Sequence, residues 1–266
     1  VLISKLKRKI IILNVSDLWP LAGLQMGILK KGFYYNLLER IECFNYKSAR
    51  VILGQSEEIL EHIKSIIPEK NLFLYRNLPN FKVSKKIQSK KTSEIKIVYA
   101  GLLGVAQNVA NICEQIKLPE NVSLDIYGDG PEAEKIKELC NNNLKLNYHG
   151  LIDRNELHNA LINYDFTLIP LLNRIYGSVP SKIFEYSRLG LPIIFLSEGE
   201  GSDLVNKYKL GYTLKDNDFN GLNNLISHIA NQRIAPFKSS ELQKTAMEVF
   251  DFNIQFNKLL ERTNSI

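Results

Sequence analysis

Short apolar segments alternate with amphipathic ones over most of the chain, and the alternation is most regular after residue 95. Apolar runs such as IKIVYA and PIIFLS have the length of buried strands, and the segments between them have helical spacing. The predicted strands cover 95–100, 122–128, 144–150, 165–170 and 192–197. The helices predicted between them cover 105–116, 131–140, 154–163 and 180–190. Strands that alternate with helices predict an α/β fold with a doubly wound, parallel, Rossmann-like sheet.

The first 80 residues contain fewer strands and more helix. We expect strands at 10–15, 51–53 and 72–75, and helices at 32–50 and 56–66, the second capped by Ser56. This region is interpreted as a partial first domain (1–80), and the second domain is expected at 95–238. A final amphipathic helix is predicted within 239–266, with Leu242, Phe250 and Leu260 on its apolar face.

Residues 81–94 are rich in lysine and poor in apolar side chains, which is typical of a solvated linker between domains. Lys82, Lys85 and Lys90 belong to this run. The alternative is a basic patch that contacts a membrane surface or a phosphate.

The composition is that of an ordinary globular protein, with 45% hydrophobic and 23% charged residues, and it argues against disorder and fibrous repeats. The net charge of +6 suits an anionic partner, but no motif of aromatic and basic residues favours nucleic acid. Three cysteines are too few for a disulfide framework, which favours a reducing, cytoplasmic setting. The chain starts at Val1 and reaches a strand almost at once, so we expect that an earlier part of the first domain is missing.

Three glycine-bearing segments follow three successive predicted strands. The first contains Gly101 and Gly104, the second is YGDGP (127–131), and the third contains Gly150 and Leu151. Glycine lets backbone amides approach a phosphate, and a following helix N-terminus adds a positive dipole end. The alternative for each segment is an ordinary strand-to-helix turn.

The segment GSVPSKIFEY (177–186) is the strongest local feature. A turn at Gly177 and Ser178 leads into a helix that starts near Pro180, so amides between Ser178 and Ser181 are expected to point at an anion. Lys182 adds a full charge there, and Glu185, one turn later, is of the residue type that binds ribose hydroxyls in other nucleotide folds. The alternative is a surface pair of Lys182 and Glu185 on an ordinary helix.

The ordered set YAGLLGVAQN, IYGDGPE, YHG, VPSKIFEYSRLGLPIIF and GEGSD resembles the retaining glycosyltransferases of family 4. The upstream SDLWP, LLERIE and SARVILGQSEEI resemble the end of the first domain of members that transfer amino sugars or deoxy sugars in bacterial capsule and O-antigen assembly. The resemblance implies the GT-B fold, in which two Rossmann-like domains face each other, and a final helix that crosses back to the first domain.

The resemblance also assigns roles to single residues. It implies that Gly101 and Gly104 lie near the diphosphate, together with Ser181 and Lys182. Gly150 and Leu151 would lie near the base, and Glu185 would bind the ribose. The first acid of the family's paired-glutamate motif is replaced by Gly177, so its carboxylate contact to the donor sugar is either missing or replaced by backbone amides at Gly177 and Ser178.

The leading hypothesis is transfer of a hexosyl or N-acetylhexosaminyl group from a nucleotide diphosphate-sugar, UDP-linked in our interpretation, to a glycan or lipid-linked acceptor with retention. No metal or other cofactor is expected, because Lys182 and backbone amides would stabilise the departing diphosphate. In the mechanism that the resemblance implies, an oxygen of this diphosphate would take the proton of the acceptor. Asp17 and Trp19 are assigned an acceptor-side role by resemblance, with loop packing as the alternative. The expected location is cytoplasmic, with peripheral contact at the inner membrane face. A non-catalytic nucleotide-sugar-binding fragment and a sugar-nucleotide epimerase are the other hypotheses.

Overall fold

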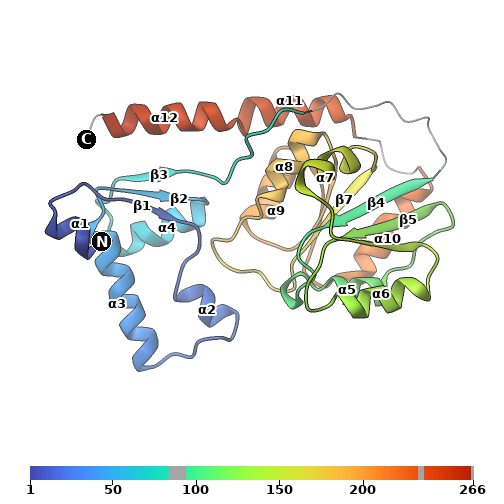
Figure 1. The fold of residues 1–266 in the computed structure, drawn as a ribbon, viewed down its shortest axis with the longest axis horizontal. Coiled ribbons are helices and arrows are strands. Elements are labelled where there is room, and N and C mark those ends of the chain that lie inside the picture. Colours follow the sequence, from blue (N-terminus) through green and yellow to red (C-terminus); the bar gives the residue numbers. More distant parts are fainter. Residues whose placement is uncertain (84–93, 233–236, 265–266) are drawn as a thin grey trace. The chain divides into compact units, whose positions relative to one another are not determined.

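The computed structural model describes residues 1–83, 94–232 and 237–264 (Figure 1). The chain divides into two compact units. The first unit comprises residues 1–78, 175–181 and 252–266, and the second comprises 79–174 and 182–251. We describe each unit by itself.

The second unit is built on a six-stranded sheet in which every strand pair is parallel. Its strands are β4 (Ile95–Ala100), β5 (Val122–Tyr127), β6 (Leu146–Gly150), β7 (Phe166–Pro170), β8 (Ile193–Leu196) and β9 (Gly211–Leu214). The order is β6-β5-β4-β7-β8-β9, so the chain reverses its direction of progress between β4 and β7. In doubly wound sheets the ligand crevice lies at such a reversal, outside the carboxyl ends of the strands. The predicted fold class is therefore confirmed.

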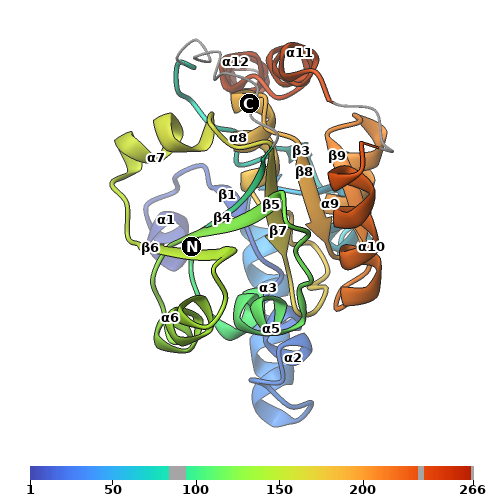
Figure 2. The same ribbon diagram turned by 90° about the vertical axis from the view of Figure 1, so that its right-hand side faces the viewer.

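Helices cover both faces of this sheet, and α7 and α8 lie on the side opposite α5 and α6 (Figure 2). The helices of the unit are η1 (Val105–Gln107, a 3-10 turn), α5 (Val109–Gln115), α6 (Ala133–Asn141), α7 (Arg154–Leu161), α8 (Lys182–Leu189), α9 (Glu200–Lys207), α10 (Phe219–Ala230) and α11 (Ser239–Val249). Apolar positions of β5 alternate along the strand: Val122, Leu124 and Ile126 join the core formed with α5, α6 and α10. The intervening polar positions face the other way, which is the period-two alternation of a strand.

The first unit contains a three-stranded parallel sheet of order β1-β2-β3. Its elements are α1 (Leu2–Leu6), β1 (Ile12–Val15), α2 (Leu21–Gln25), α3 (Phe33–Ser48), β2 (Val51–Gly54), α4 (Glu57–Ile66), β3 (Leu72–Leu74) and α12 (Phe252–Asn264). Ile52, Ile59 and Ile63 are fully buried in its core. The predicted cap of α4 is confirmed, since the Ser56 hydroxyl accepts from the amide of Ile59 at 3.1 Å.

Helix α12 is tied to the rest of the first unit by side-chain hydrogen bonds. The Gln255 amide group accepts from the backbone N–H of Arg76 and donates to its carbonyl, both at 2.9 Å. Arg262 Nε donates to Asn71 Oδ1 at 3.0 Å. The side-chain amide of Gln255 thus satisfies two backbone groups just past β3.

Two predicted helices are interrupted in the structure. The helix expected at 105–116 consists of η1 and α5, because Asn108 adopts a left-handed conformation with φ of 54°. The helix expected at 239–263 consists of α11 and α12, separated at Phe250 and Asp251. Phe250 turns into the core against Phe184, with ring centroids 4.9 Å apart, and this burial takes the backbone out of the helical path.

The basic segment predicted at 81–94 lies outside the described residues from 84 to 93. Over the residues that the structure describes, the helices lack the length and apolar character that a membrane crossing requires.

Candidate functional site

The three glycine segments lie side by side at the carboxyl edge of the sheet. The amide of Gly101 donates to the carbonyl of Tyr127 at 2.9 Å, and the amide of Gly128 donates to the carbonyl of Gly150 at 2.8 Å. These bonds continue the hydrogen-bond ladder of β4, β5 and β6 at the carboxyl ends of the strands. The segments of Gly101, Gly128 and Gly150, which are up to 50 residues apart, therefore form one continuous surface that we call the glycine rim.

A pocket of about 330 Å³ opens at this rim. It is lined by Ala100, Gly101, Leu102, Tyr127, Gly128, Asp129, Leu151, Ile152 and Leu157. Backbone of two glycines and the apolar side chains of Leu102, Leu151 and Leu157 dominate the lining, which suits a flat, largely apolar group whose polar edge meets main-chain atoms.

The ammonium group of Lys182 lies against the first glycine segment. Its Nζ donates to the carbonyl of Ala100, the last residue of β4, and lies 5.1 Å from the centre of the Tyr99 ring. Burial lowers the pKa of Lys182 to about 8, although the negative charge of Glu185 acts in the opposite direction. The structure thus holds a partly desolvated cation next to the pocket, and such a cation is more strongly attracted to an anion than one in water.

Two glycines of the rim lie close to other groups, with different consequences. A Cβ on Gly101 would meet Lys182 Nζ, the movable end of a flexible side chain, whereas a Cβ on Gly128 would meet the backbone carbonyl oxygen of Gly101. Gly128 also has a φ of +141°, which disfavours any residue with a side chain. The rim can therefore pack this tightly only with glycine at Gly128, whereas a side chain in place of Gly101 would displace the end of Lys182.

Glu185 lies one helical turn after Lys182 and contacts a residue of α7. Its Oε1 is 2.7 Å from His158 Nε2, and the two side chains are 21% and 22% exposed. The His158 ring also stacks on Phe81, with ring centroids 4.1 Å apart. The sequence allowed a simple surface pair between Lys182 and Glu185. In the structure each side chain has another partner instead: the Ala100 carbonyl for Lys182 and His158 for Glu185.

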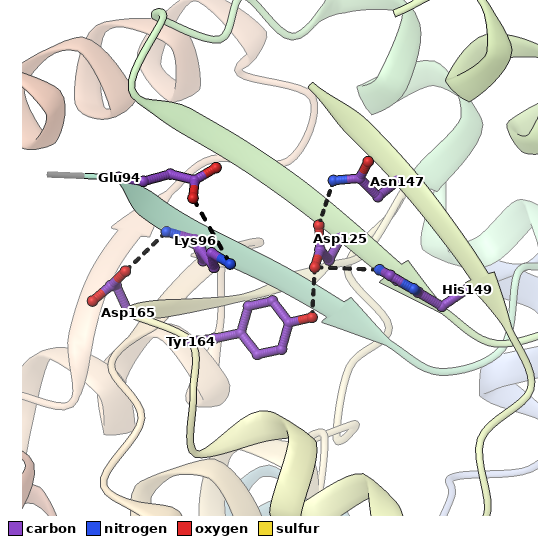
Figure 3. A network of polar contacts seen from close by, with 7 residues as sticks. All are labelled: Glu94, Lys96, Asp125, Asn147, His149, Tyr164 and Asp165. Carbon is purple, nitrogen blue, oxygen red and sulfur yellow. Dashed lines mark hydrogen bonds and ion pairs between the residues drawn. The ribbon is translucent and has the colours of Figure 1, made fainter. Parts of the chain in front are cut away.

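A polar network supports the pocket residue Tyr127. Asp125 on β5 accepts from Tyr164 at 2.6 Å and from Asn147 at 2.7 Å, and its Oδ2 is 3.2 Å from His149 Nε2 (Figure 3). The His149 ring stacks on Tyr127 at 4.5 Å, and the Tyr127 hydroxyl is 3.0 Å from that of Tyr164. Burial, followed by the hydrogen bond to Asp125, raises the pKa of Tyr164, so its hydroxyl stays a donor. Tyr127 is thereby fixed through both its ring and its hydroxyl.

The turn before α8 belongs to the first unit. The amide of Gly177 donates to Glu58 Oε2 at 2.7 Å, its carbonyl accepts from the Ser56 hydroxyl at 2.8 Å, and the amide of Ser178 donates to the carbonyl of Ile175 at 3.0 Å. The amides of Gly177 and Ser178 were expected to face a bound anion. In the structure they donate instead to the Glu58 carboxylate and to the carbonyl of Ile175. Phosphate binding by Gly177, Ser178 and Ser181 stays a prediction, and at Gly177 it requires the bond to Glu58 to break.

Asp17 lies after β1 in the first unit, at the edge of a second pocket of about 270 Å³. Trp19, Asn45 and the buried Glu42 also line this pocket. Glu42 Oε1 accepts from the Tyr46 hydroxyl at 2.8 Å and lies 3.4 Å from His62 Nε2. The carboxylates of Asp17 and Glu42 give the pocket a negative lining that suits neutral or amino-bearing ligands better than phosphates.

Sequence reasoning identified the rim but not everything that completes it. Of the predicted residues, Gly101 and Leu151 line the pocket. Gly150 is hydrogen-bonded to the lining residue Gly128, and Lys182 contacts Gly101. Gly104 is the N-cap of η1 and does not belong to the lining. His158 was missed, because a contact between residues 27 positions apart has no local signal. Leu157 was missed as well, although its closeness to Gly150 and to the start of α7 could have indicated it.

In the described part of the chain, no three His, Cys, Asp or Glu side chains gather in a way that could hold a metal ion. The arrangement that is present combines a doubly wound sheet, a glycine rim at the carboxyl ends of β4, β5 and β6, an apolar pocket and a desolvated lysine. The class of protein that this fold defines is the doubly wound α/β class, in which nucleotides and similar phosphorylated ligands bind at the carboxyl ends of the strands.

Residues 94–232 match the sequence profile of the family described as Glycosyl transferases group 1. The match covers more than half of the chain, and the protein belongs to this family. Comparison with curated protein sequences found no match.

Solved structures of glycosyltransferases share the fold. Staphylococcus aureus TarM, solved with UDP, is 16% identical, with a TM-score of 0.68 over 85% of this chain and 46% of its own. Anabaena HepE, solved with UDP-glucose, is 14% identical, with a TM-score of 0.74 over 100% of this chain and 75% of its own. The pneumococcal O-GlcNAc transferase GtfA, solved with UDP and GlcNAc, is 12% identical, with a TM-score of 0.72 over 98% of this chain and 53% of its own. The chain thus has a GT-B-like fold and spans about half the length of TarM and GtfA.

Proposed function

We propose that the protein transfers a hexosyl or N-acetylhexosaminyl group from a UDP-sugar to a glycan or lipid-linked acceptor, with retention, in cell-surface polysaccharide synthesis. The observation that carries the proposal is the glycine rim with Lys182 Nζ against Gly101, beside a pocket of about 330 Å³. The family match and the UDP in the three similar structures support the choice of donor.

In this proposal the base enters the pocket between Leu102 and Leu151, and the diphosphate lies at Gly101. The ammonium of Lys182 exchanges its bond to the Ala100 carbonyl for one to a phosphate oxygen. The bond between the anomeric carbon and the β-phosphate oxygen breaks, a bond from the acceptor oxygen to the same carbon forms, and the acceptor proton goes to the departing diphosphate. Lys182 stabilises the charge that develops on the diphosphate. Because a resident cation does this, we expect transfer to continue when EDTA is present.

The acceptor is proposed to meet the first unit near Asp17 and Trp19. The negative lining there favours a neutral or amino-bearing acceptor. Peripheral contact with the inner face of the cytoplasmic membrane remains part of the proposal, supported by the net charge of +6.

A mass-spectrometric screen of UDP-sugars and GDP-sugars, each with glycan and lipid-linked acceptors, tests the proposal. We expect one UDP-sugar to yield a glycosylated product with retained anomeric configuration. Binding of UDP-sugars with neither transfer nor hydrolysis would support the non-catalytic alternative, and a preference for GDP-sugars would contradict the donor assignment.

Glu185→Gln tests the nucleotide-binding part separately. If Glu185 binds the ribose, the variant should lose about 10–150-fold in affinity for UDP, the scale of a hydrogen bond to a charged group, and little for pyrophosphate. Isothermal titration calorimetry measures both. Equal losses for the two ligands would contradict ribose binding.

A further inference from the structure

Helices α7 and α8 contact each other through His158 and Glu185, and a neighbouring residue of each helix lies at the glycine rim or its pocket. On α7, Leu157 lines the pocket and the next residue, His158, faces α8. On α8, Lys182 does not line the pocket but reaches the lining residue Gly101, and Glu185 faces α7. The contact between His158 and Glu185 therefore lies next to the proposed donor site on both helices.

The contact leaves half of the Glu185 carboxylate available. A carboxylate accepts only, so the imidazole Nε2 that lies 2.7 Å from Oε1 carries the hydrogen and donates it. Within the described residues, Oε2 of Glu185 accepts no hydrogen bond from a side chain or a backbone amide. An ionised carboxylate has about four acceptor positions, so one imidazole bond leaves room for two hydroxyl groups.

His158 is itself held from the opposite side. Its ring stacks on Phe81 at 4.1 Å, and the carbonyl of Phe81 accepts from Arg188 Nε at 3.1 Å. The Arg188 guanidinium also lies 5.7 Å from the centre of the Phe81 ring. Since Arg188 and Glu185 are three residues apart on α8, the chain of contacts starts and ends on the same helix. Such a closed set fixes the imidazole in one orientation.

We propose that His158 is a positioning residue for the donor ribose: it holds the Glu185 carboxylate so that Oε2 faces the vicinal hydroxyls. The inference rests on the proposed function. It predicts that His158 contributes to affinity only when the ligand carries a ribose diol, because the diol is the group that Glu185 would bind.

Calorimetry on the full chain, with UDP and with 2′,3′-dideoxy-UDP as ligands, tests the inference. The variants are His158→Ala, His158→Gln, Glu185→Gln and, as a matched control, His228→Ala, which removes an exposed histidine of α10 in the same unit. We expect His158→Ala to lower the affinity for UDP about 3–10-fold and the affinity for dideoxy-UDP less than about 2-fold. His158→Gln, which retains an N–H donor, should recover most of the loss, and His228→Ala should bind both ligands as the wild type does.

Two results would overturn the inference while leaving the proposed function intact. One is unchanged UDP affinity in His158→Ala when Glu185→Gln is weakened. The other is an equal loss for both ligands that His158→Gln does not reverse, which would indicate that His158 only supports the packing of α7. A wild-type chain that binds neither ligand would instead refute the proposed function, and this inference with it.

Discussion

Lys182 is subject to two opposing requirements. Its ammonium lies where burial lowers its pKa to about 8, which disfavours the charge, yet the proposed function uses that charge at the diphosphate. A residue that is unfavourable for folding and favourable for a ligand is typical of functional sites. The bond to the Ala100 carbonyl provides a partner while no ligand is bound.

The affinity for UDP is expected to fall as the pH rises through about 8, because Lys182 then loses its charge. Lys182→Met should bind UDP about 1–3 kcal/mol more weakly near neutral pH and lack this pH-dependent step. Calorimetry between about pH 7 and about pH 9.5 measures both effects. A wild-type profile that is parallel to that of the variant would remove Lys182 from the phosphate site.

The same pKa shift has a consequence for folding. The pKa is about 8 in the folded chain and 10.5 ordinarily, so between these values the unfolded chain binds more protons. The free energy of unfolding of the wild type should therefore rise with pH in this window relative to Lys182→Met. Urea unfolding at several pH values checks the sign, and a relative decrease would contradict the burial of the ammonium.

Gly128 and Gly150 form a matched pair for testing the rim. Both have positive φ, but a Cβ on Gly128 would meet the Gly101 carbonyl, whereas nothing lies within 4 Å of a Cβ on Gly150. Gly150→Ala should cost about 1–2 kcal/mol of stability from backbone strain alone. Gly128→Ala should cost more stability and should also lower the affinity for UDP. Urea unfolding with calorimetry separates them, and equal costs would argue against tight packing of the first two segments.

At the scale of elements, the Asp125 network joins β5, β6 and the turn between α7 and β7. One carboxylate serves Tyr164, Asn147 and His149, which come from segments that the sheet brings together. Because Tyr164 also contacts the Tyr127 hydroxyl, the network connects strand pairing to the pocket wall. Interactions of this kind are non-additive, since removing the shared acceptor leaves several donors without partners.

A double-mutant cycle with Asp125→Ala and Tyr164→Phe measures that coupling. Tyr164→Phe removes one hydroxyl and should cost about 0.5–1.5 kcal/mol, whereas Asp125→Ala leaves several donors unpaired and should cost about 1–3 kcal/mol. The double variant should cost less than the sum. Strict additivity in urea unfolding would show that the two side chains do not act together.

At the scale of the whole molecule, the two units contribute different chemistry. The second unit carries the rim, Lys182 and the acid proposed to bind ribose, Glu185. The first unit carries a negatively lined pocket and includes both the turn before α8 and helix α12. The chain passes between the units at 174–175, 181–182 and 251–252, in addition to 78–79. The segment predicted as one motif, 177–186, is thus shared between two compact units.

Hydrogen exchange with and without UDP should separate the units. We expect UDP to slow exchange in peptides that contain 99–104, 127–131, 150–157 and 182–186, and to leave β2 and β3 unchanged. Protection would follow from backbone amides that bind the ligand and from reduced local opening. Slowed exchange in β2 and β3 with none at the rim would contradict the assignment of the donor site to the second unit.

Strands β4 to β8, most of the helices between them, their parallel pairing and the glycine rim were predictable from the sequence alone, whereas the breaks at Asn108 and Phe250 were not. Period-two and helical patterns report local burial, and parallel strands place their carboxyl ends at one edge, so Gly101 and Gly150 were expected to lie together. The roles of Lys182 and Glu185 were hypotheses that depended on where α8 would lie. The tertiary structure decided their partners: Ala100 for Lys182, His158 for Glu185, and Glu58 for the amide of Gly177. The physical reason is that a strand or helix follows from contacts within a few residues, whereas a side-chain partner is selected by competition among groups that only the folded chain brings within hydrogen-bond distance.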